Sequence, residues 1–488
     1  MIKKNNRKKV IEEINQKNII DIFNIIPNMC DKVLNYVEKE FNIIDLIKKV
    51  LIDKRKYESK IKIELLFLAG ISAKLKQQHA ISEMPLAITC NRIIDKLDTN
   101  VYYDNKESIL KESNIRAILN LYETNVKETN DFNNEFIVFF NDFNKSFLEI
   151  AEVNSNIHIL DCSILDVNYN NENYEGSTTT EKGGKKLRGY KIAALRGITP
   201  NGGVIEEISM SSAKDNDFKM SKDFVLNSKY LKPGDYLLED RGFLDIEQIK
   251  ELNKKEIKVI IPAKKNMEIY VAAMETAKSK DEWIKHPNPK RKGQEITLIE
   301  NMESFYLTQS DQKKKIENLD LDYKLNCCVI RFDLNKNKDL LTDEEVISTD
   351  KKYAYAVIMT NDINLPCQDI IRMYEQRPEI EEDFRQLKDF WGLNEFKSTK
   401  YTTNSFSMIC TLMGYNFYQI YKESEEGSKY IGKSLIVEQK HGFYVTKGVT
   451  TAIITDNYFG IFNQAELLDL YADLTKAKRE LIKNFLIL

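Results

Sequence analysis

Five residues in one short segment have side chains whose types and spacing could do chemistry. Tyr374, Arg377, Glu381, Phe384 and Lys388 are separated by 3, 4, 3 and 4 residues. On an α-helix this spacing places all five on one face, which in a surface helix is normally apolar and packs on the core. Here four of the five are polar or charged, and such groups are costly to bury unless they are paired or bind a ligand. The segment therefore indicates a functional site around Glu381.

Pro378 modifies this prediction, because proline removes a helix hydrogen bond and disfavours helix at the residue before it. The sequence predicts that the helix presenting Glu381 begins at Pro378. Tyr374 and Arg377 then belong to a preceding turn or helix.

Two aspartates upstream could complete a site with Glu381. Asp161 interrupts an apolar run at residues 157–165 that is typical of a buried strand, and Asp240 follows the strand predicted at 235–239. Carboxylates are the hard oxygen ligands that Mg²⁺ prefers. Two such ions can activate an attacking oxygen and stabilise a leaving oxygen in phosphodiester chemistry.

Each carboxylate also has an ordinary structural interpretation. Asp161 could be a turn or edge-strand residue, and Asp240 could cap the following helix. Glu381 could form an exposed salt bridge with Arg377 or Arg385. The joint occurrence of the three carboxylates, in this order and with the polar helix face, favours the metal site.

The elements that would position these residues indicate a mixed α/β protein. Residues 1–150 have a helical pattern with almost no alternation of apolar and polar residues. Strand and helix patterns follow, and Thr-Pro-Asn-Gly-Gly at 199–203 predicts a hairpin turn. This order predicts a mixed sheet with one long insertion. The expected divisions are a helical region at 1–150, a first part of the core at 151–265, a β-rich insertion at 266–350, a second part of the core at 351–425 and a C-terminal tail at 426–488.

The motifs resemble those of the DDE transposases of bacterial insertion sequences, and in particular the group with a Tyr-Arg-Glu-Lys signature, the insertion-sequence-four family. The residues that carry the resemblance are Asp161 in a strand, Asp240-Arg-Gly-Phe243 after a strand, and Tyr374-x2-Arg377-x3-Glu381-x6-Lys388. The resemblance covers residues 155–425. It implies an RNase H-like mixed-sheet core, interrupted by a largely β insertion and preceded by an all-helical N-terminal region.

The resemblance also implies a reaction. Hydrolysis at a transposon end would free a 3′-hydroxyl, which would then attack target DNA. Asp161, Asp240 and Glu381 would hold two Mg²⁺ ions, for which Mn²⁺ could substitute. The implied partner is double-stranded DNA, as transposon ends and target, bound by a homodimer that assembles on the DNA. Residues 1–150 would bind the ends, and residues 426–488 would contribute to dimerisation.

Further residues are expected to contact the DNA. By the resemblance, Tyr374, Arg377 and Lys388 would bind phosphates near the scissile bond, in keeping with the groups they can donate. Trp283, the one tryptophan of the insertion, would stack on a flipped base, although a half-buried structural role is the alternative. Two arginines beside the motifs complete the expected DNA-binding set, Arg241 and Arg385.

The amino-acid composition gives mixed support for a DNA-binding function. A net charge of −3 and a pI near 6.1 are unusual for a nucleic-acid-binding protein, although lysine and arginine cluster locally, as at 182–191 and 285–292. Seven cysteines without CxxC pairs predict reduced core cysteines of a cytoplasmic protein, and the resemblance to transposases implies association with the bacterial nucleoid. No apolar run is long enough to span a bilayer, so no membrane partner is expected, and residues 405–421 predict a buried helix.

Two other classes of function remain open. One is a non-catalytic DNA-binding protein derived from a transposase, such as a repressor, and three intact carboxylates count against it. The other is an RNase H-like nuclease that cuts without joining strands. The long N-terminal block and the insertion count against that class, because plain nuclease cores are shorter.

Overall fold

The computed structural model describes most of the chain. The described residues are 4–16, 18–25, 29–56, 61–88, 90–97, 110–303, 323–334, 347–348, 352–433, 435, 450–462, 469–470 and 472–475. The chain divides into two compact units. Unit 1 contains Met1–Glu152, Val167–Gly176 and Gln386–Leu488, and unit 2 contains Val153–Asp166 and Ser177–Arg385.

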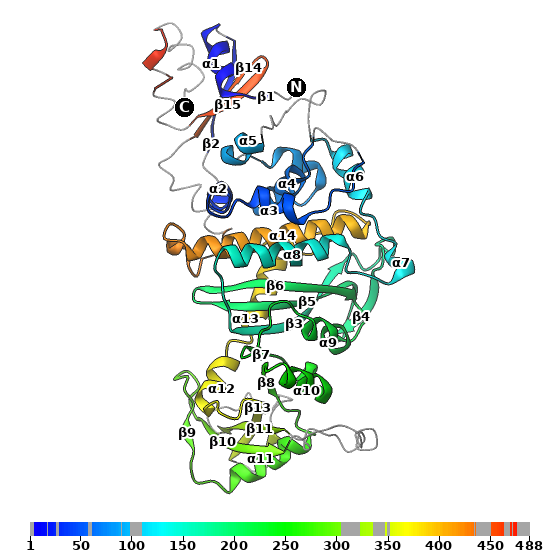
Figure 1. The fold of residues 1–488 in the computed structure, drawn as a ribbon, viewed down its shortest axis with the longest axis vertical. Coiled ribbons are helices and arrows are strands. Elements are labelled where there is room, and N and C mark those ends of the chain that lie inside the picture. The colour runs from blue at the N-terminus through cyan, green and yellow to red at the C-terminus, as the bar shows by residue number, and fades with distance from the viewer. Residues whose placement is uncertain are drawn as a thin grey trace. The chain divides into compact units, whose positions relative to one another are not determined.

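Unit 2 is built on one 11-stranded mixed sheet (Figure 1). Its strand order is β4-β5-β3-β7-β8-β13-β11-β10-β9, with β6 paired to β5 and β12 paired to β13. β3 and β7 are parallel, as are β7 and β8, whereas β13 pairs with β8 in the antiparallel sense. The strands are β3 Ile157–Val167, β4 Thr178–Lys182, β5 Lys185–Thr199, β6 Gly202–Ser212, β7 Tyr236–Leu238, β8 Lys258–Pro262, β9 Ile284–Lys285, β10 Gln294–Glu303, β11 Lys324–Asp333, β12 Ile347–Ser348 and β13 Tyr353–Thr360.

The parallel pairing of β3 and β7 determines where the two predicted aspartates lie. Ile159 of β3 is level with Leu238 of β7. Asp161 and Asp240 each follow two residues later, so both stand at the same level along neighbouring parallel chains. The carboxyl ends of parallel strands are where sites assemble in α/β sheets.

Helices cover both faces of the sheet where β10, β11 and β13 pair. Side chains alternate between the faces of a strand. In β11, Cys327 and Val329 join the same apolar cluster as residues of α11 (Glu268–Lys278), while Cys328 contacts Cys367 at the start of α12 (Cys367–Tyr374). Burial on both faces explains why β11 is almost continuously apolar. The remaining helical elements of unit 2 are α9 Asp217–Leu226, η2 Arg241–Phe243, α10 Ile246–Lys254 and α13 Glu379–Asp389, the last of which runs into unit 1.

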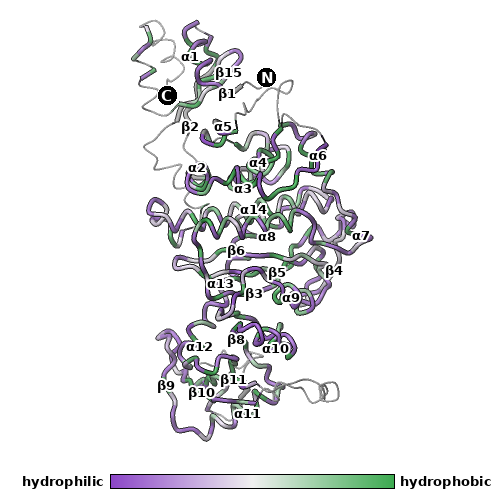
Figure 2. Tube along the Cα trace, viewed as in Figure 1, coloured by the Kyte–Doolittle hydropathy of each residue, from purple (hydrophilic) through white to green (hydrophobic). Residues whose placement is uncertain are grey.

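Unit 1 is mostly helical and is organised around α14 (Tyr401–Glu423), which is buried along nearly its whole length and packs against α2, α4, α6 and α8. This agrees with the buried helix predicted for residues 405–421. Hydrophobic residues run along these central helices, whereas the chain around β9 of unit 2 is hydrophilic (Figure 2). The other helices are α1 Arg7–Asn15, α2 Met29–Phe41, α3 Ile43–Val50, α4 Ile63–Leu75, η1 Ile81–Leu86, α5 Asn91–Leu97, α6 Glu112–Asn120, α7 Val126–Thr129, α8 Glu135–Ile150 and η6 Ser428–Tyr430.

The expectation that residues 1–150 are all helical is wrong in one respect. Unit 1 also contains a four-stranded sheet in the order β1-β15-β14-β2, which joins the two ends of the chain. Its strands are β1 Lys4–Asn5, β2 Ile19–Ile25, β14 Thr450–Thr455 and β15 Tyr458–Phe462. β14 and β15 form a local hairpin, but the pairing of β2 with β14 is non-local, since Ile25 pairs with Thr450, and local sequence patterns carry no signal for it. The mixed α/β class with a mostly helical N-terminal region is confirmed.

The cysteine prediction needs a correction. Cys328 of β11 and Cys367 of α12 form a disulfide, with their Cα atoms 5.5 Å apart, whereas the sequence was expected to hold only reduced cysteines. The other five cysteines are buried and form no disulfide in the described part of the chain. None of the described helices combines the length and the apolar character needed to cross a membrane.

Candidate active site

The two predicted aspartates have different surroundings. Asp161 lies within β3 and its side chain is largely buried. Asp240 lies two residues after the end of β7, and its Oδ1 accepts a hydrogen bond from the backbone N–H of Arg241 at 2.7 Å, which caps the short helix η2. The capping role considered for Asp240 is therefore real. The other carboxylate oxygen of Asp240, Oδ2, lies 3.9 Å from Arg377 Nη2.

The segment that carries Glu381 is divided as Pro378 predicts. Helix α12 begins after Pro366 and ends at Tyr374, and α13 begins at Glu379. The amide of Glu381 donates to the carbonyl of Pro378 at 3.1 Å, within the first turn of α13. Carboxylates are stabilised in that position by the helix dipole. Arg377 lies in the turn between the two helices.

Arg377 brings the three predicted carboxylates together. Its Nη2 lies 3.2 Å from Asp161 Oδ1 and 3.9 Å from Asp240 Oδ2, and its Nη1 donates to Glu381 Oε1. The guanidinium is buried. Three carboxylates that are distant in the sequence thus converge on one cation. With all four groups ionised, the cluster has a net charge of −2.

The electrostatics of the cluster favour an additional cation. Burial raises the pKa of Asp161 to about 6; Arg377 opposes this shift, and the charges of Glu381 and Asp240 reinforce it. Burial disfavours the charge of Arg377, but Asp161, Asp240 and Glu381 outweigh that effect and raise its pKa. Excess negative charge near buried carboxylates is relieved when a cation binds.

The donor set fits a hard divalent cation in its chemistry, because it consists of carboxylate oxygens. Within the described part of the chain, however, no three His, Cys, Asp or Glu side chains are grouped closely enough to hold one metal ion. Arg377 contacts all three acids in the arrangement seen, so these carboxylates would have to leave the guanidinium to share an ion.

The remaining predicted residues are placed as follows. Arg385 is exposed on α13 and pairs with Glu382 at 2.5 Å. Lys388 lies in the last turn of α13, beyond the part of the helix that belongs to unit 2. Tyr374 ends α12, and Arg241 lies in η2 next to Asp240. Among the predicted phosphate-binding residues, Arg377 contacts the carboxylates of Asp161, Asp240 and Glu381.

Trp283 has a structural environment. Its ring is half-buried and packs at the edge of the apolar cluster of unit 2. The guanidinium carbon of Arg331 lies 4.1 Å from the ring centroid, and the indole N–H donates to the carbonyl of Lys280 at 3.1 Å. One ring face is thus engaged by an arginine of β11, which supports the half-buried structural alternative.

A basic loop of the insertion is fixed beside Tyr374. Asn288 Nδ2 donates to both carboxylate oxygens of Glu375, at 2.9 and 3.1 Å, and Arg291 Nε donates to Glu375 Oε1 at 3.2 Å. A pocket of about 780 Å³ lies here, with His286, Arg291 and Tyr374 among its lining residues. Glu375 therefore positions part of the basic 285–292 segment next to the end of α12.

Sequence reasoning missed Arg196. This arginine lies buried in β5, and its Nε donates to Asp383 Oδ2 at 2.5 Å while its Nη2 lies 2.9 Å from Glu379 Oε2. Glu379 and Asp383 are one helical turn apart on α13 and flank Glu381. Arg196 thus fixes the orientation of the helix that presents Glu381. An arginine within the apolar run of residues 189–199 was the available signal.

A second buried network of ionisable side chains is centred on His158 of β3. His158 Nδ1 is 2.6 Å from Glu206 Oε2, and its Nε2 is 3.4 Å from Asp235 Oδ2. Burial acts to lower the pKa of His158, but the two carboxylates outweigh burial and raise it to about 9. This network joins β3, β6 and the start of β7, the strands on which the two aspartates depend.

The fold and the site together define a class, an α/β protein with an acidic site formed by residues within β3, after β7 and in the first turn of α13. The model of the transposase DDE domain family matches residues 157–417, which are 261 of the 488 residues and include every residue predicted for the site. The chain belongs to the DDE transposase family. No curated protein matches the chain.

Proposed function

We propose that the protein is a DNA transposase that cleaves transposon ends and joins the freed 3′-hydroxyl to target DNA. The observation that carries this proposal is the convergence of Asp161, Asp240 and Glu381 on Arg377. Membership of the DDE transposase family supports the class of reaction. The Tyr-Arg-Glu-Lys spacing supports the narrower insertion-sequence-four group.

The three carboxylates would hold two Mg²⁺ or Mn²⁺ ions, which supply activation of the attacking oxygen and stabilisation of the leaving oxygen. Arg377, released from the carboxylates, would donate to a DNA phosphate, for which a guanidinium is well suited. Tyr374, Lys388 and the basic loop fixed by Glu375 would extend the phosphate contacts. Arg241 and Arg385 would add to them at the edges of the site.

The catalytic core would be RNase H-like. This is supported by the parallel strands β3, β7 and β8 with the antiparallel hairpin of β5 and β6 beside β3. The strands of residues 266–350 would form the insertion, which extends the same sheet through β13. We further propose that residues 1–150 bind transposon ends, and that residues 426–488, many of which lie outside the described residues, contribute to a homodimer on DNA.

The test is cleavage of DNA that carries the flanking inverted repeats, in the presence of Mg²⁺. Wild type should release a 3′-hydroxyl and join it to target DNA, and Glu381→Gln should do neither. The matched control is Glu382→Gln, because Glu382 is adjacent, exposed and paired with Arg385. Cleavage by Glu381→Gln at the wild-type rate would refute the proposed site.

The same assay separates the alternatives. Cleavage without joining by wild type would indicate a nuclease without strand transfer. Specific binding of the inverted repeats without cleavage would indicate a non-catalytic DNA-binding protein. Only joining that depends on Glu381 supports the transposase proposal.

A further inference from the structure

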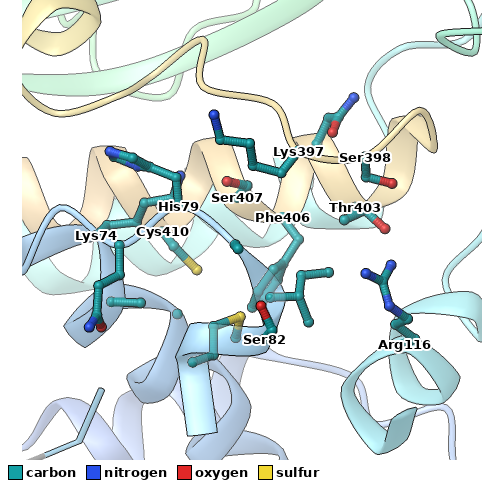
Figure 3. A pocket seen from close by; sticks show the side chains of 17 residues that line it. Lys74, His79, Ser82, Arg116, Lys397, Ser398, Thr403, Phe406, Ser407 and Cys410 are labelled. Atoms are coloured by element: carbon teal, nitrogen blue, oxygen red, sulfur yellow. The ribbon is translucent and has the colours of Figure 1, made fainter. Parts of the chain in front are cut away.

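Unit 1 contains a pocket whose charged lining residues are all basic. Its empty volume of about 560 Å³ includes space that is open to solvent. Its side chains come from α4 and the turn after it, from η1, from α6 and from α14 with the segment before it (Figure 3). The charged or polar lining residues that matter here are Lys74, His79, Arg116, Lys397, Thr403 and Asn404.

Lys74 is the unusual member of this lining. It lies in the last turn of α4 and only 4% of the residue is exposed. Its Nζ lies 3.5 Å from His79 Nδ1, and no carboxylate of a described residue lies within ion-pair distance of it. A buried ammonium group without a counter-ion is costly, so the position calls for an anion that the described protein does not supply.

The charged surroundings of Lys74 agree with this. Burial lowers the pKa of Lys74 to about 8, and the nearby charges are too weak to offset burial. The groups that act on it are Cys410 of α14, Glu395 and Lys397 of the segment before α14, and Glu83 of η1, in addition to His79. Glu395 is 2.7 Å from Lys397, and Glu83 accepts from the backbone N–H of Ala80, so both carboxylates have other partners.

Asn404 provides an independent observation. It lies on α14, it lines the same pocket, and only 2% of the residue is exposed. Its Nδ2 has no hydrogen-bond partner among the described residues. An unsatisfied buried donor costs free energy and is rare in native proteins. A buried ammonium group without a counter-ion and a buried amide donor without an acceptor among the described residues thus line the same pocket.

We propose that this pocket binds a phosphate group, with Lys74 and Asn404 as its buried donors. Arg116 and Lys397 are exposed at the pocket and would add positive charge, although each is also paired, with Glu112 and Glu395 respectively. A phosphate has enough acceptor oxygens to satisfy donors from several elements at once, whereas a carboxylate has two oxygens. The phosphate could be carried by a small molecule or by a DNA strand.

The first test is binding of inorganic phosphate, measured by calorimetry and by the shift in unfolding temperature, against sodium chloride at equal ionic strength. Lys74→Met should weaken binding at least about tenfold, because hydrogen bonds to charged groups contribute that much or more. Without phosphate, Lys74→Met should unfold at or above the wild-type temperature, since it removes an uncompensated buried charge. The control is Lys49→Met, an exposed lysine of α3, which should behave as wild type.

Equal phosphate binding by wild type and Lys74→Met would overturn the proposal. A lower unfolding temperature of Lys74→Met without phosphate would also overturn it, because Lys74 would then have a structural partner. If Lys74→Met does not fold at all, Asn404→Leu decides. It must fold and lose phosphate binding for the proposal to stand.

Competition then identifies the source of the phosphate. Stronger displacement by a nucleoside 5′-monophosphate than by duplex DNA, at equal phosphate concentration, supports a small-molecule ligand. Stronger displacement by duplex DNA supports a backbone phosphate. Absence of binding by inorganic phosphate, mononucleotide and duplex alike would refute a phosphate site. Because the test needs no DNA cleavage and uses residues of unit 1, its failure would leave the proposed transposase activity untouched.

Discussion

Replacement of Arg377 by methionine tests whether one guanidinium holds the three carboxylates together. The side chains of Arg377 and Asp161 are 10% and 16% exposed, whereas those of Asp240 and Glu381 are 37% and 57% exposed. Removing one partner of a fully buried ion pair costs about 3–5 kcal/mol, and exposed pairs contribute at most about 1 kcal/mol. With the Asp161 pair dominant but not fully buried, we expect Arg377→Met to lose about 2–4 kcal/mol of unfolding free energy.

The assay is denaturant unfolding with and without Mg²⁺. Without arginine, the carboxylates are free to bind the ion, and a ligand at 100 times its Kd stabilises the folded state by about 2.7 kcal/mol. Mg²⁺ should therefore stabilise Arg377→Met more than wild type, in which Arg377 competes. Arg372→Met is the control, because Arg372 is exposed on α12, and it should change stability by less than about 0.5 kcal/mol. An Mg²⁺ effect no larger in Arg377→Met than in wild type would refute the reasoning.

Three further predictions concern the elements that support the site. Arg196→Met should lower the unfolding free energy by about 3–5 kcal/mol, because it leaves the buried carboxylate of Asp383 without its partner. The double variant Arg196→Met, Asp383→Leu should recover most of this loss, because both charges of the pair are then removed. His158 has a raised pKa of about 9 against 6.5 in the unfolded chain, so its stabilisation is full below pH 6.5 and is lost as the pH rises through 9. This loss of unfolding free energy is at most about 1.4 kcal/mol per pH unit. His158→Gln should make the loss smaller when the free energy of unfolding is measured from pH 6 to pH 10. Reduction of the Cys328–Cys367 bond, which spans 39 residues, should cost at most about 4 kcal/mol, and peptide mapping without reductant should recover the linked peptides. Unchanged stability in Arg196→Met, an unaltered pH profile in His158→Gln, or absence of linked peptides would contradict the respective prediction.

The local features of the site were predictable from the sequence. Three local patterns predict where the site residues lie in the chain: an acidic residue in an apolar strand, an aspartate after a strand, and a proline before a glutamate. Asp161, Asp240 and Pro378 lie where these rules place them. Their convergence was an inference from order and residue type, because periodicity gives no distance between elements.

Features that depend on long-range pairing could not be predicted. The ion pair of Arg196 with Asp383 joins residues 187 positions apart, and no local rule selects one acid among many. The disulfide of Cys328 and Cys367 likewise needs the register of β11 against α12. The same holds for the sheet that pairs β2 with β14. The indole of Trp283 packs with Arg331, which only the fold brings beside it.

The most direct test of the central claim is calorimetric titration of the protein with Mn²⁺. If Asp161, Asp240 and Glu381 form one metal site, wild type binds the ion, and Asp161→Asn, Asp240→Asn and Glu381→Gln each lose most of that binding. Glu382→Gln should bind Mn²⁺ as wild type does. Equal Mn²⁺ binding by wild type and all three carboxylate variants would contradict the account.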